Sequence, residues 1–261
     1  MKTAFVQWPE NLHPISPEWS AIEKQVAASE GLQLLVTSEL PFGPWIASNA
    51  TFDPVTAQQS VDVHEAGIKA LKNLKLPLVI SSRPVWAADG RLANEAFALD
   101  NGVYVSLHQK HYFPEEPRFH EQTWFGTAKP GFNLTTLCGG RLKVGVLLCT
   151  DVMFTERARL YGRDGADLIV VPRASSVNSV ETFFVAGRMA AISSGCYVVS
   201  SNKVGKVGES PNFCGFGYAI APDGSVMGPM TDTDSPLKVV ELDFEAVRRQ
   251  QKEYPCYVHE L

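Results

Sequence analysis

Continuously apolar segments of strand length alternate with helical patterns along the whole chain, and this alternation constrains the fold most. The segments LLVTS, VGVLLC and LIVVP are apolar throughout, which is typical of strands that are covered on both faces. Strands are predicted at 3–7, 32–38, 76–81, 95–99, 102–110, 142–149, 168–172, 197–202, 217–221 and 238–242. Helices are predicted at 17–29, 56–73, 155–164, 180–194 and 243–253. A repeated strand–helix order predicts an α/β fold in which helices pack on the faces of sheets.

Three turn sequences interrupt the alternation: ADG at 88–90, DNG at 100–102 and PDG at 222–224. An Asn-Gly or Asp-Gly pair between two apolar runs indicates a hairpin, whose strands are antiparallel. We therefore expect mixed sheets. The chain has no internal repeat, no low-complexity tract and no linker rich in Pro, Gly or Ser, so one domain is predicted over residues 1–261.

Composition excludes several classes of function. The chain has 23 Lys and Arg against 28 Asp and Glu, so it lacks the surplus of cations that non-specific nucleic-acid binding needs. No apolar stretch approaches the roughly 18 to 20 residues of a membrane helix, and the first residues do not resemble a signal peptide. The five cysteines show no CxxC spacing, which favours free thiols in a reducing compartment. We expect a cytoplasmic protein that binds neither nucleic acid nor membrane.

One cysteine differs from the others in its position. Cys149 closes an apolar strand and is followed by a turn and a helix. Catalytic groups in α/β sheets gather beyond the carboxyl ends of strands, and a helix N-terminus favours the thiolate. The alternative is an inert buried thiol, which is the commonest state of a free cysteine. The other four, at 138, 196, 214 and 256, are interpreted as packing residues.

A nucleophilic cysteine needs a base, and the six histidines offer no clear candidate. His13 and His259 lie near the ends of the chain, His64 falls in a predicted helix, and three more surround one strand end. The sequence HQKH at 108–111 could be a pair of metal ligands, but zinc would lack a third. No phosphate-binding loop and no GxGxxG sequence occurs either, so we expect neither metal nor cofactor.

Two further residues occupy the same kind of position as Cys149. Glu39 ends the strand LQLLVTSE, and Lys110 ends GVYVSLHQK. Each could be a solvated residue of a loop. A carboxylate at the end of an apolar strand is nevertheless costly unless it is paired or functional. The order Glu, Lys, Cys at three strand ends resembles the nitrilase superfamily of carbon–nitrogen hydrolases.

The resemblance extends over nearly the whole chain. The matching segments are TSELPFGPW at 37–45, HQKHYF at 108–113, HEQTWFGTAKPGF at 120–132, LLCTDVMFTERAR at 147–159, ADLIVVPRAS at 166–175, GCYVVSSNKVG at 195–205 and NFCGFGYAIAPDGSVM at 212–227. The chain departs from the family at Thr155, where a proline is usual, and at 193–195, where many relatives have Glu-Asn-Gly. No departure removes a member of the triad.

The resemblance implies an α-β-β-α sandwich of two mixed sheets with helices outside, and a homodimer that involves the helix at 155–164. It also implies that Glu39 acts as the base and Cys149 as the nucleophile. Lys110 and the backbone N–H of Thr150 would stabilise the oxyanion. Glu121 is the choice for a second glutamate that orients the lysine, with Glu115 and Glu116 as alternatives.

The substrate is predicted to be a small amide with a partly apolar acyl group. Thr150 and Asp151 follow the cysteine, whereas true nitrilases have Cys-Trp-Glu there, so the amidase branch is favoured. The residues at 152–154 include no arginine that could bind a substrate carboxylate. Arg173 could bind such a carboxylate from another direction, or it could form a structural ion pair. The aromatic residues expected to line the pocket, unless they are simply core, are Phe42, Trp45, Trp124 and Phe154.

Other functions remain open from the sequence. The protein could be a retired member of the family that only binds ligands, or a member that hydrolyses N-carbamoyl compounds or nitriles. It could be a glutamine amidotransferase or cysteine peptidase, both of which need a histidine as base. An acyl transferase, in which an amine replaces water, has the same first step.

Overall fold

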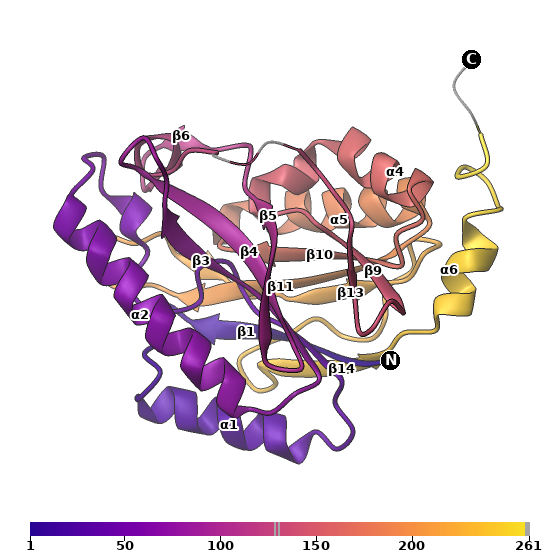
Figure 1. The fold of residues 1–261 in the computed structure, drawn as a ribbon, viewed down its shortest axis with the longest axis horizontal. Coiled ribbons are helices and arrows are strands. Elements are labelled where there is room, and N and C mark those ends of the chain that lie inside the picture. The colour runs from indigo at the N-terminus through magenta and orange to yellow at the C-terminus, as the bar shows by residue number, and fades with distance from the viewer. Residues whose placement is uncertain (128, 130, 259–261) are drawn as a thin grey trace.

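Two layers of β-strands lie face to face in the computed structural model, which describes residues 1–127, 129 and 131–258 (Figure 1). The first layer has the order β5-β4-β3-β2-β1, with β14 on the free edge of β1. Its strands are β1 (Lys2–Pro9), β2 (Leu34–Val36), β3 (Leu78–Trp86), β4 (Leu92–Asp100), β5 (Val103–Gln109) and β14 (Leu237–Glu241). β1, β2 and β3 are parallel to one another, whereas β4, β5 and β14 pair antiparallel, so the layer is mixed.

The second layer has the order β11-β10-β9-β8, with β12 and β13 paired to β11. Its strands are β8 (Thr135–Leu137), β9 (Leu142–Val146), β10 (Leu168–Arg173), β11 (Tyr197–Gly205), β12 (Phe213–Cys214) and β13 (Tyr218–Ile220). The last residues of β1 pair with β11, from Gln7 opposite Asn202 to Pro9 opposite Val204. The two predicted mixed sheets are thus present, and this short ladder joins them at one edge.

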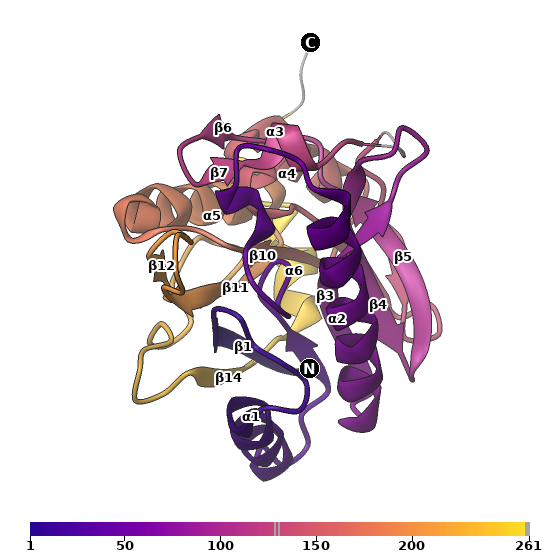
Figure 2. The ribbon, with the colours of Figure 1, turned by 90° about the vertical axis from the view of Figure 1, so that its left-hand side faces the viewer.

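Helices cover the outer face of each layer (Figures 1 and 2). The helices α1 (Pro17–Ala28) and α2 (Pro54–Asn73) pack on the first layer, and α4 (Thr155–Arg163) and α5 (Val180–Ser194) pack on the second. The core between the layers contains Phe5, Val36 and Ile80 from one side and Val144 and Val170 from the other. The predicted α-β-β-α sandwich is confirmed.

Local sequence explains where these helices begin and end. Ser16 precedes α1 and accepts a hydrogen bond from the backbone N–H of Trp19, and Asp53 caps α2 in the same way. Both helices carry proline in the first turn, where no backbone N–H is needed. Gly195 ends α5 with φ of +67°, a conformation that glycine adopts without strain.

The long elements and the short strands β2 and β13 lie where the sequence predicts them, whereas the other short elements are not predicted. The predicted DNG turn joins β4 to β5, with positive φ at both Asn101 and Gly102, as a type I′ turn requires. The unpredicted elements are β6 (Glu115–Glu116), β7 (Phe119–His120), β8, β12, α3 (Glu121–Trp124), η1 (Ile46–Ser48), η2 (Cys149–Met153) and η3 (Val177–Ser179). The helix predicted at 243–253 is present as α6 (Phe244–Gln250). None of the helices in the described part of the chain is both long and apolar enough to span a membrane.

Candidate active site

Three strands deliver Glu39, Lys110 and Cys149 to one end of the sandwich. Glu39 follows β2, Lys110 directly follows β5, and Cys149 follows β9 as the first residue of η2. All three side chains are buried, with relative exposures of 0%, 0% and 4%. Burial of two charged groups at the ends of apolar strands is costly unless each has a partner, so their contacts decide what the site can do.

Lys110 lies between two carboxylates. Its Nζ is 2.9 Å from Oε1 of Glu39 and 2.5 Å from Oε2 of Glu121. Nδ2 of Asn94 on β4 also donates to Oε1 of Glu39, at 2.7 Å. Oε2 of Glu39 has no hydrogen-bond partner among the described residues. One carboxylate oxygen is therefore held by two donors, and the other is unoccupied.

The charges of this cluster do not balance, since two carboxylates face one ammonium. Burial and the neighbouring Glu39 raise the pKa of Glu121 to about 8, although Lys110 opposes the shift. Burial disfavours the charge of Lys110, but Glu121 and Glu39 outweigh it and raise the pKa of this lysine well above its ordinary value. Around neutral pH Lys110 therefore stays an ammonium, and the carboxyl group of Glu121 retains its proton.

Cys149 lies at a strained turn. Its φ is +49°, which costs an L-residue with a side chain roughly 1–2 kcal/mol. Burial raises the pKa of the thiol well above its usual range, and the charge of Glu39 raises it further, while Lys110 acts in the opposite direction. The resting side chain is thus a thiol, and a nucleophile forms only when a nearby base removes the proton.

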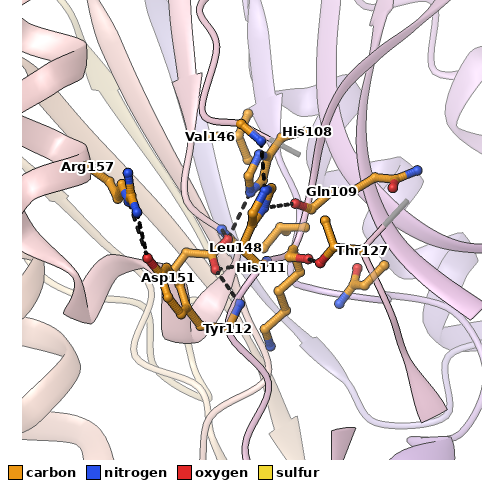
Figure 3. A network of polar contacts seen from close by, with 12 residues as sticks. His108, Gln109, His111, Tyr112, Thr127, Val146, Leu148, Asp151 and Arg157 are labelled. Atoms are coloured by element: carbon orange, nitrogen blue, oxygen red, sulfur yellow. Dashed lines mark hydrogen bonds and ion pairs between the residues drawn. The ribbon is translucent and has the colours of Figure 1, made fainter. Parts of the chain in front are cut away.

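Asp151 connects Leu148, just before the cysteine turn, to His111 and Tyr112, just after Lys110 (Figure 3). Its Oδ2 accepts from the backbone N–H of Leu148 at 3.1 Å and contacts Nε2 of His108 at 2.9 Å. Its Oδ1 accepts from the backbone N–H groups of His111 and Tyr112, at 3.2 and 3.1 Å. Because this carboxylate is fully buried and occupied by four contacts, it holds Cys149 and Lys110 in a fixed relation.

A pocket of about 690 Å³ opens beside the cluster. Cys149 and Glu121 line its inner part together with Thr150, which directly follows the cysteine. Its apolar lining includes Phe119, Met153 and Phe183. The pocket also has polar and charged lining residues, which include Ser175, Ser176, Asn178, Ser179, Asn212, Glu116 and Arg118. The space accommodates a small molecule that reaches the thiol.

The structure places four predicted pocket residues elsewhere. Phe42 packs between the first layer and α2, against Trp19 and the ring of His64. Trp124 is buried beside Phe52, and its indole N–H donates to the backbone of Asn49. The remaining two aromatic residues, Trp45 and Phe154, contact Phe213 and Tyr112 respectively and do not line the pocket.

Arg173 does not face the pocket either. Its guanidinium donates to the hydroxyls of Ser200 and Ser175 and to the backbone oxygen of Phe216. It also lies over the rings of Phe183 and Tyr218. All of these contacts hold the second layer together, so the expected carboxylate binding by Arg173 does not fit its position. Nor does it form an ion pair with any described acid.

The alternative glutamates and the histidines have other contacts. Glu115 binds the ring of His120 and the backbone N–H of Thr123, at the surface, whereas Glu121 is the glutamate that contacts Lys110. His108 and His111 stack on each other with ring centroids 5.2 Å apart. Within the described ranges, no group of three His, Cys, Asp or Glu side chains is arranged to hold a metal ion. His259 lies outside the described residues.

Sequence reasoning missed two residues of the site. Asn94 lies within β4 and has an ordinary strand sequence around it. Nothing in that sequence indicates that it donates a hydrogen bond to Glu39. Asp151 follows the cysteine closely in sequence, but its contacts depend on the loop at 108–112, which is remote in sequence. A fully buried amide and a fully buried carboxylate on apolar elements are the signals that only the fold reveals.

Known proteins resemble this chain in sequence and in fold. The family model for carbon-nitrogen hydrolases matches residues 2–252. A Pseudomonas protegens protein described as a hydrolase in the pqqF 5′ region is 30% identical over 93% of this chain and 83% of its own length. The crystal structure of a carbon-nitrogen hydrolase from Helicobacter pylori has a TM-score of 0.86 at 18% identity, covering 98% of this chain and 94% of that one. An amidase from Nesterenkonia has a TM-score of 0.75 at 22% identity, covering 95% of this chain and 92% of that one.

Proposed function

The chain belongs to the carbon-nitrogen hydrolase family, and we propose that it hydrolyses small linear amides through a thioester on Cys149. The observation that carries the proposal is the contact of Lys110 with both Glu39 and Glu121, beside the pocket that Glu121 and Cys149 line. This cluster combines a base, a fixed cation and a nucleophile, which are the parts that acyl transfer needs.

The first step is deprotonation and attack. Glu39 accepts the proton of the Cys149 thiol, and the sulfur attacks the carbonyl carbon of the amide, forming the carbon–sulfur bond. The free Oε2 of Glu39 is the oxygen available for that proton, since Oε1 is held by Asn94 and Lys110. A histidine is not required, because the carboxylate of Glu39 serves as the base in this mechanism.

The oxyanion of the tetrahedral intermediate then needs donors. Lys110 supplies a charged donor in a water-poor site, where such a group is worth far more than in bulk water. The backbone N–H of Thr150 is the second donor, and the turn that begins at Cys149 orients it. Glu121 positions Lys110 and is a positioning residue in this scheme.

The intermediate collapses when the carbon–nitrogen bond breaks. The proton on Glu39 passes to the departing nitrogen, so that ammonia or an amine leaves and a thioester remains. Water then attacks the thioester with Glu39 again as base. The sulfur leaves as the thiol when Glu39 returns the proton, and the carboxylic acid is released.

Relatives support an amide as the substrate. One variant of the Nesterenkonia amidase carries the acetamide moiety of fluoroacetamide on its active-site cysteine. Another structure of that amidase contains butyramide. These ligands are small and linear, and the pocket beside Cys149 combines apolar and polar walls that suit such a group.

Ammonia release from a panel of amides, N-carbamoyl compounds and nitriles tests the proposal. We expect release from at least one linear amide, and a loss of about 10³-fold or more in Cys149→Ala and Glu39→Gln, because each removes a group that acts in the chemical step. Release from nitriles or carbamoyl compounds but from no amide would contradict the proposed substrate class. Loss of activity in a single His→Ala variant, with Glu39→Gln fully active, would favour a histidine-based amidotransferase or peptidase mechanism instead.

A further inference from the structure

A small hairpin at the mouth of the pocket carries an arginine in an unfavourable conformation. β6 and β7 pair through Glu115 opposite His120 and Glu116 opposite Phe119, which leaves Pro117 and Arg118 as the two residues of the turn. The φ of Arg118 is +72°. In Figure 2 this hairpin lies at the top of the molecule, beside α3, and both strands contribute residues to the pocket of Cys149.

The sequence and conformation of the turn indicate that the arginine side chain has a function. Proline followed by a residue with positive φ is the pattern of a type II turn, in which glycine is the favoured second residue. Arginine at that position costs about 1 kcal/mol or more. The turn is fixed from behind, because the indole N–H of Trp45 donates to the backbone oxygen of Arg118 at 3.1 Å and the ring of Trp45 packs on Phe119. Strain held by such anchoring is typical of functional positions.

The guanidinium of Arg118 is available to a ligand. Its side chain is exposed, and it makes no hydrogen bond or ion pair with any residue that the structure describes. Of the residues that line the pocket within the described ranges, it alone carries a positive charge. The two other arginines near the site are occupied, Arg157 by the hydroxyl of Tyr112 and Arg173 by serine hydroxyls.

The acidic residues of the hairpin do not neutralise this arginine. Glu115 is engaged by His120 and Thr123. Glu116 also lines the pocket and is exposed, but no ion pair joins it to Arg118 among the described residues. Glu116 would therefore favour a cationic substrate, whereas Arg118 would favour an anionic one. The experiment below distinguishes these two substrate preferences. The conformational cost falls on Arg118, which favours the anionic preference.

We propose that Arg118 binds a carboxylate at the far end of the substrate, so that this protein prefers linear amides whose acyl chain ends in a carboxylate. The proposal rests on the proposed amide hydrolysis at Cys149 and adds the class of acyl group. A planar guanidinium binds a carboxylate through two parallel hydrogen bonds, which gives orientation as well as affinity. Such a contact would hold the extended chain so that the amide lies at Cys149.

Matched substrates test the preference. Succinamate and butyramide differ only in a terminal carboxylate in place of a methyl group, and glutaramate and pentanamide form a second pair with one more methylene. For the wild type we expect kcat/KM to be higher for the carboxylate member of at least one pair. In Arg118→Gly that ratio should fall about tenfold or more, mainly through KM. Arg118→Lys should retain part of the preference, and Arg141→Gln, which removes an exposed cation before β9, at the far end from Cys149, should retain all of it.

Two further measurements separate the effect of Arg118→Gly on ligand binding from its effects on folding and on catalysis. Glycine suits the positive φ at position 118, so Arg118→Gly should unfold at a temperature equal to or above that of the wild type. Calorimetric titration with succinate and glutarate measures carboxylate binding without any chemistry. We expect binding to weaken about tenfold or more in Arg118→Gly. An unchanged affinity and an unchanged substrate ratio would overturn the role of Arg118.

Other outcomes are equally decisive. Loss of succinate binding in Arg118→Gly, with no amide hydrolysed by the wild type, would uphold the carboxylate site and refute the proposed function. A preference for 4-aminobutyramide over butyramide that disappears in Glu116→Gln would overturn the anionic preference in favour of a cationic one.

Discussion

At the residue scale, the arrangement of two carboxylates around one ammonium governs the site. Glu39 and Glu121 both contact Lys110, and only one negative charge can be balanced by it. The proton that this cluster retains resides on Glu121, whose pKa is raised to about 8. In the proposed mechanism the other carboxylate, Glu39, accepts the thiol proton through its unpartnered Oε2.

This arrangement predicts a dependence of stability on pH. Glu121 binds a proton up to a pH of about 8 in the folded protein, but only up to about 4.5 in the unfolded chain. The folded state therefore binds more protons between these values, and the free energy of unfolding falls as the pH rises, by at most about 1.4 kcal/mol per unit. Urea unfolding of the wild type and Glu121→Gln from pH 5 to pH 8 measures this. The slope should be less negative in the variant, and identical slopes would contradict the assignment.

Asp151 is expected to act through the position of Cys149. Asn at this site presents an amide N–H₂ to a cage of N–H donors, so we expect Asp151→Asn to lose about 2–3 kcal/mol of stability and to lower kcat more than it raises KM. The rate at which iodoacetamide alkylates Cys149 in the folded protein should fall as well.

Asp167→Asn is the matched control for this prediction. Asp167 is equally buried and binds the backbone of Lys143 and the side chain of Arg248, at the start of β10 and away from the pocket. It should destabilise the fold but leave the alkylation rate of Cys149 unchanged. An alkylation rate that falls equally in both variants would reduce Asp151 to a purely structural role.

Some of the site could be predicted from the sequence, because three of its residues follow apolar runs of sequence. Glu39, Lys110 and Cys149 each follow a long apolar run, so their place at one end of the sandwich can be inferred before the structure is known. The direction of a side chain in a loop or at a sheet end cannot. Phe42 and Arg173 are near strand ends too, yet both turn into the packing of the layers.

At the element scale, the turn at Cys149 contains the strain of the site. The strand predicted at 142–149 ends at Val146, and η2 begins at Cys149 with positive φ. The thiol thereby leaves the line of the strand and reaches the pocket. A backbone in this conformation is sustained by Asp151, which accepts from the N–H of Leu148 just before the turn.

Two inactive variants measure this strain. Cys149→Gly and Cys149→Ala both remove the sulfur, but only alanine retains a Cβ at positive φ. We expect the glycine variant to be more stable than the alanine variant by about 1 kcal/mol in urea unfolding, although glycine is normally the less stable choice. Greater stability of the alanine variant would show that the turn relaxes and that no strain is stored there.

Elements differ in how far sequence predicts them. The helices α2 and α5 have caps, a long apolar face and clear ends, so local sequence suffices. The strands β6 and β7 and the helix α3 are only two to four residues long and are held by remote partners such as Trp45 and Asn49. Because those partners come from another part of the chain, the hairpin that carries Arg118 could not be predicted.

At the scale of the whole molecule, the outer helices of the second layer carry exposed apolar side chains. Leu160 on α4 is 41% exposed, and Val185 and Met189 on α5 are 54% and 45% exposed. α4 and α5 pack side by side on the outer face of the second layer (Figure 1). An apolar face of this kind on a helix pair is typical of a surface that another protein covers.

We propose that this face forms a homodimer. Sedimentation should give twice the mass of the chain for the wild type at micromolar concentration, and Val185→Asp combined with Met189→Asp should shift it toward the monomer, because a charge on each partner would be buried. Val103→Asp, which changes an exposed apolar residue on β5, is the control and should not alter the mass. A monomeric wild type, or a dimer unaffected by the double substitution, would place the interface elsewhere or exclude it.

The most direct test of the account is the detection of the thioester. Intact-protein mass spectrometry of the wild type, quenched in acid during turnover of a linear amide, should show an adduct with the mass of the acyl group, and peptide mapping should place it on Cys149. Cys149→Ala should show none, although its four other cysteines remain. Ammonia release by Cys149→Ala at the wild-type rate, or an acyl group located on another residue, would contradict the account.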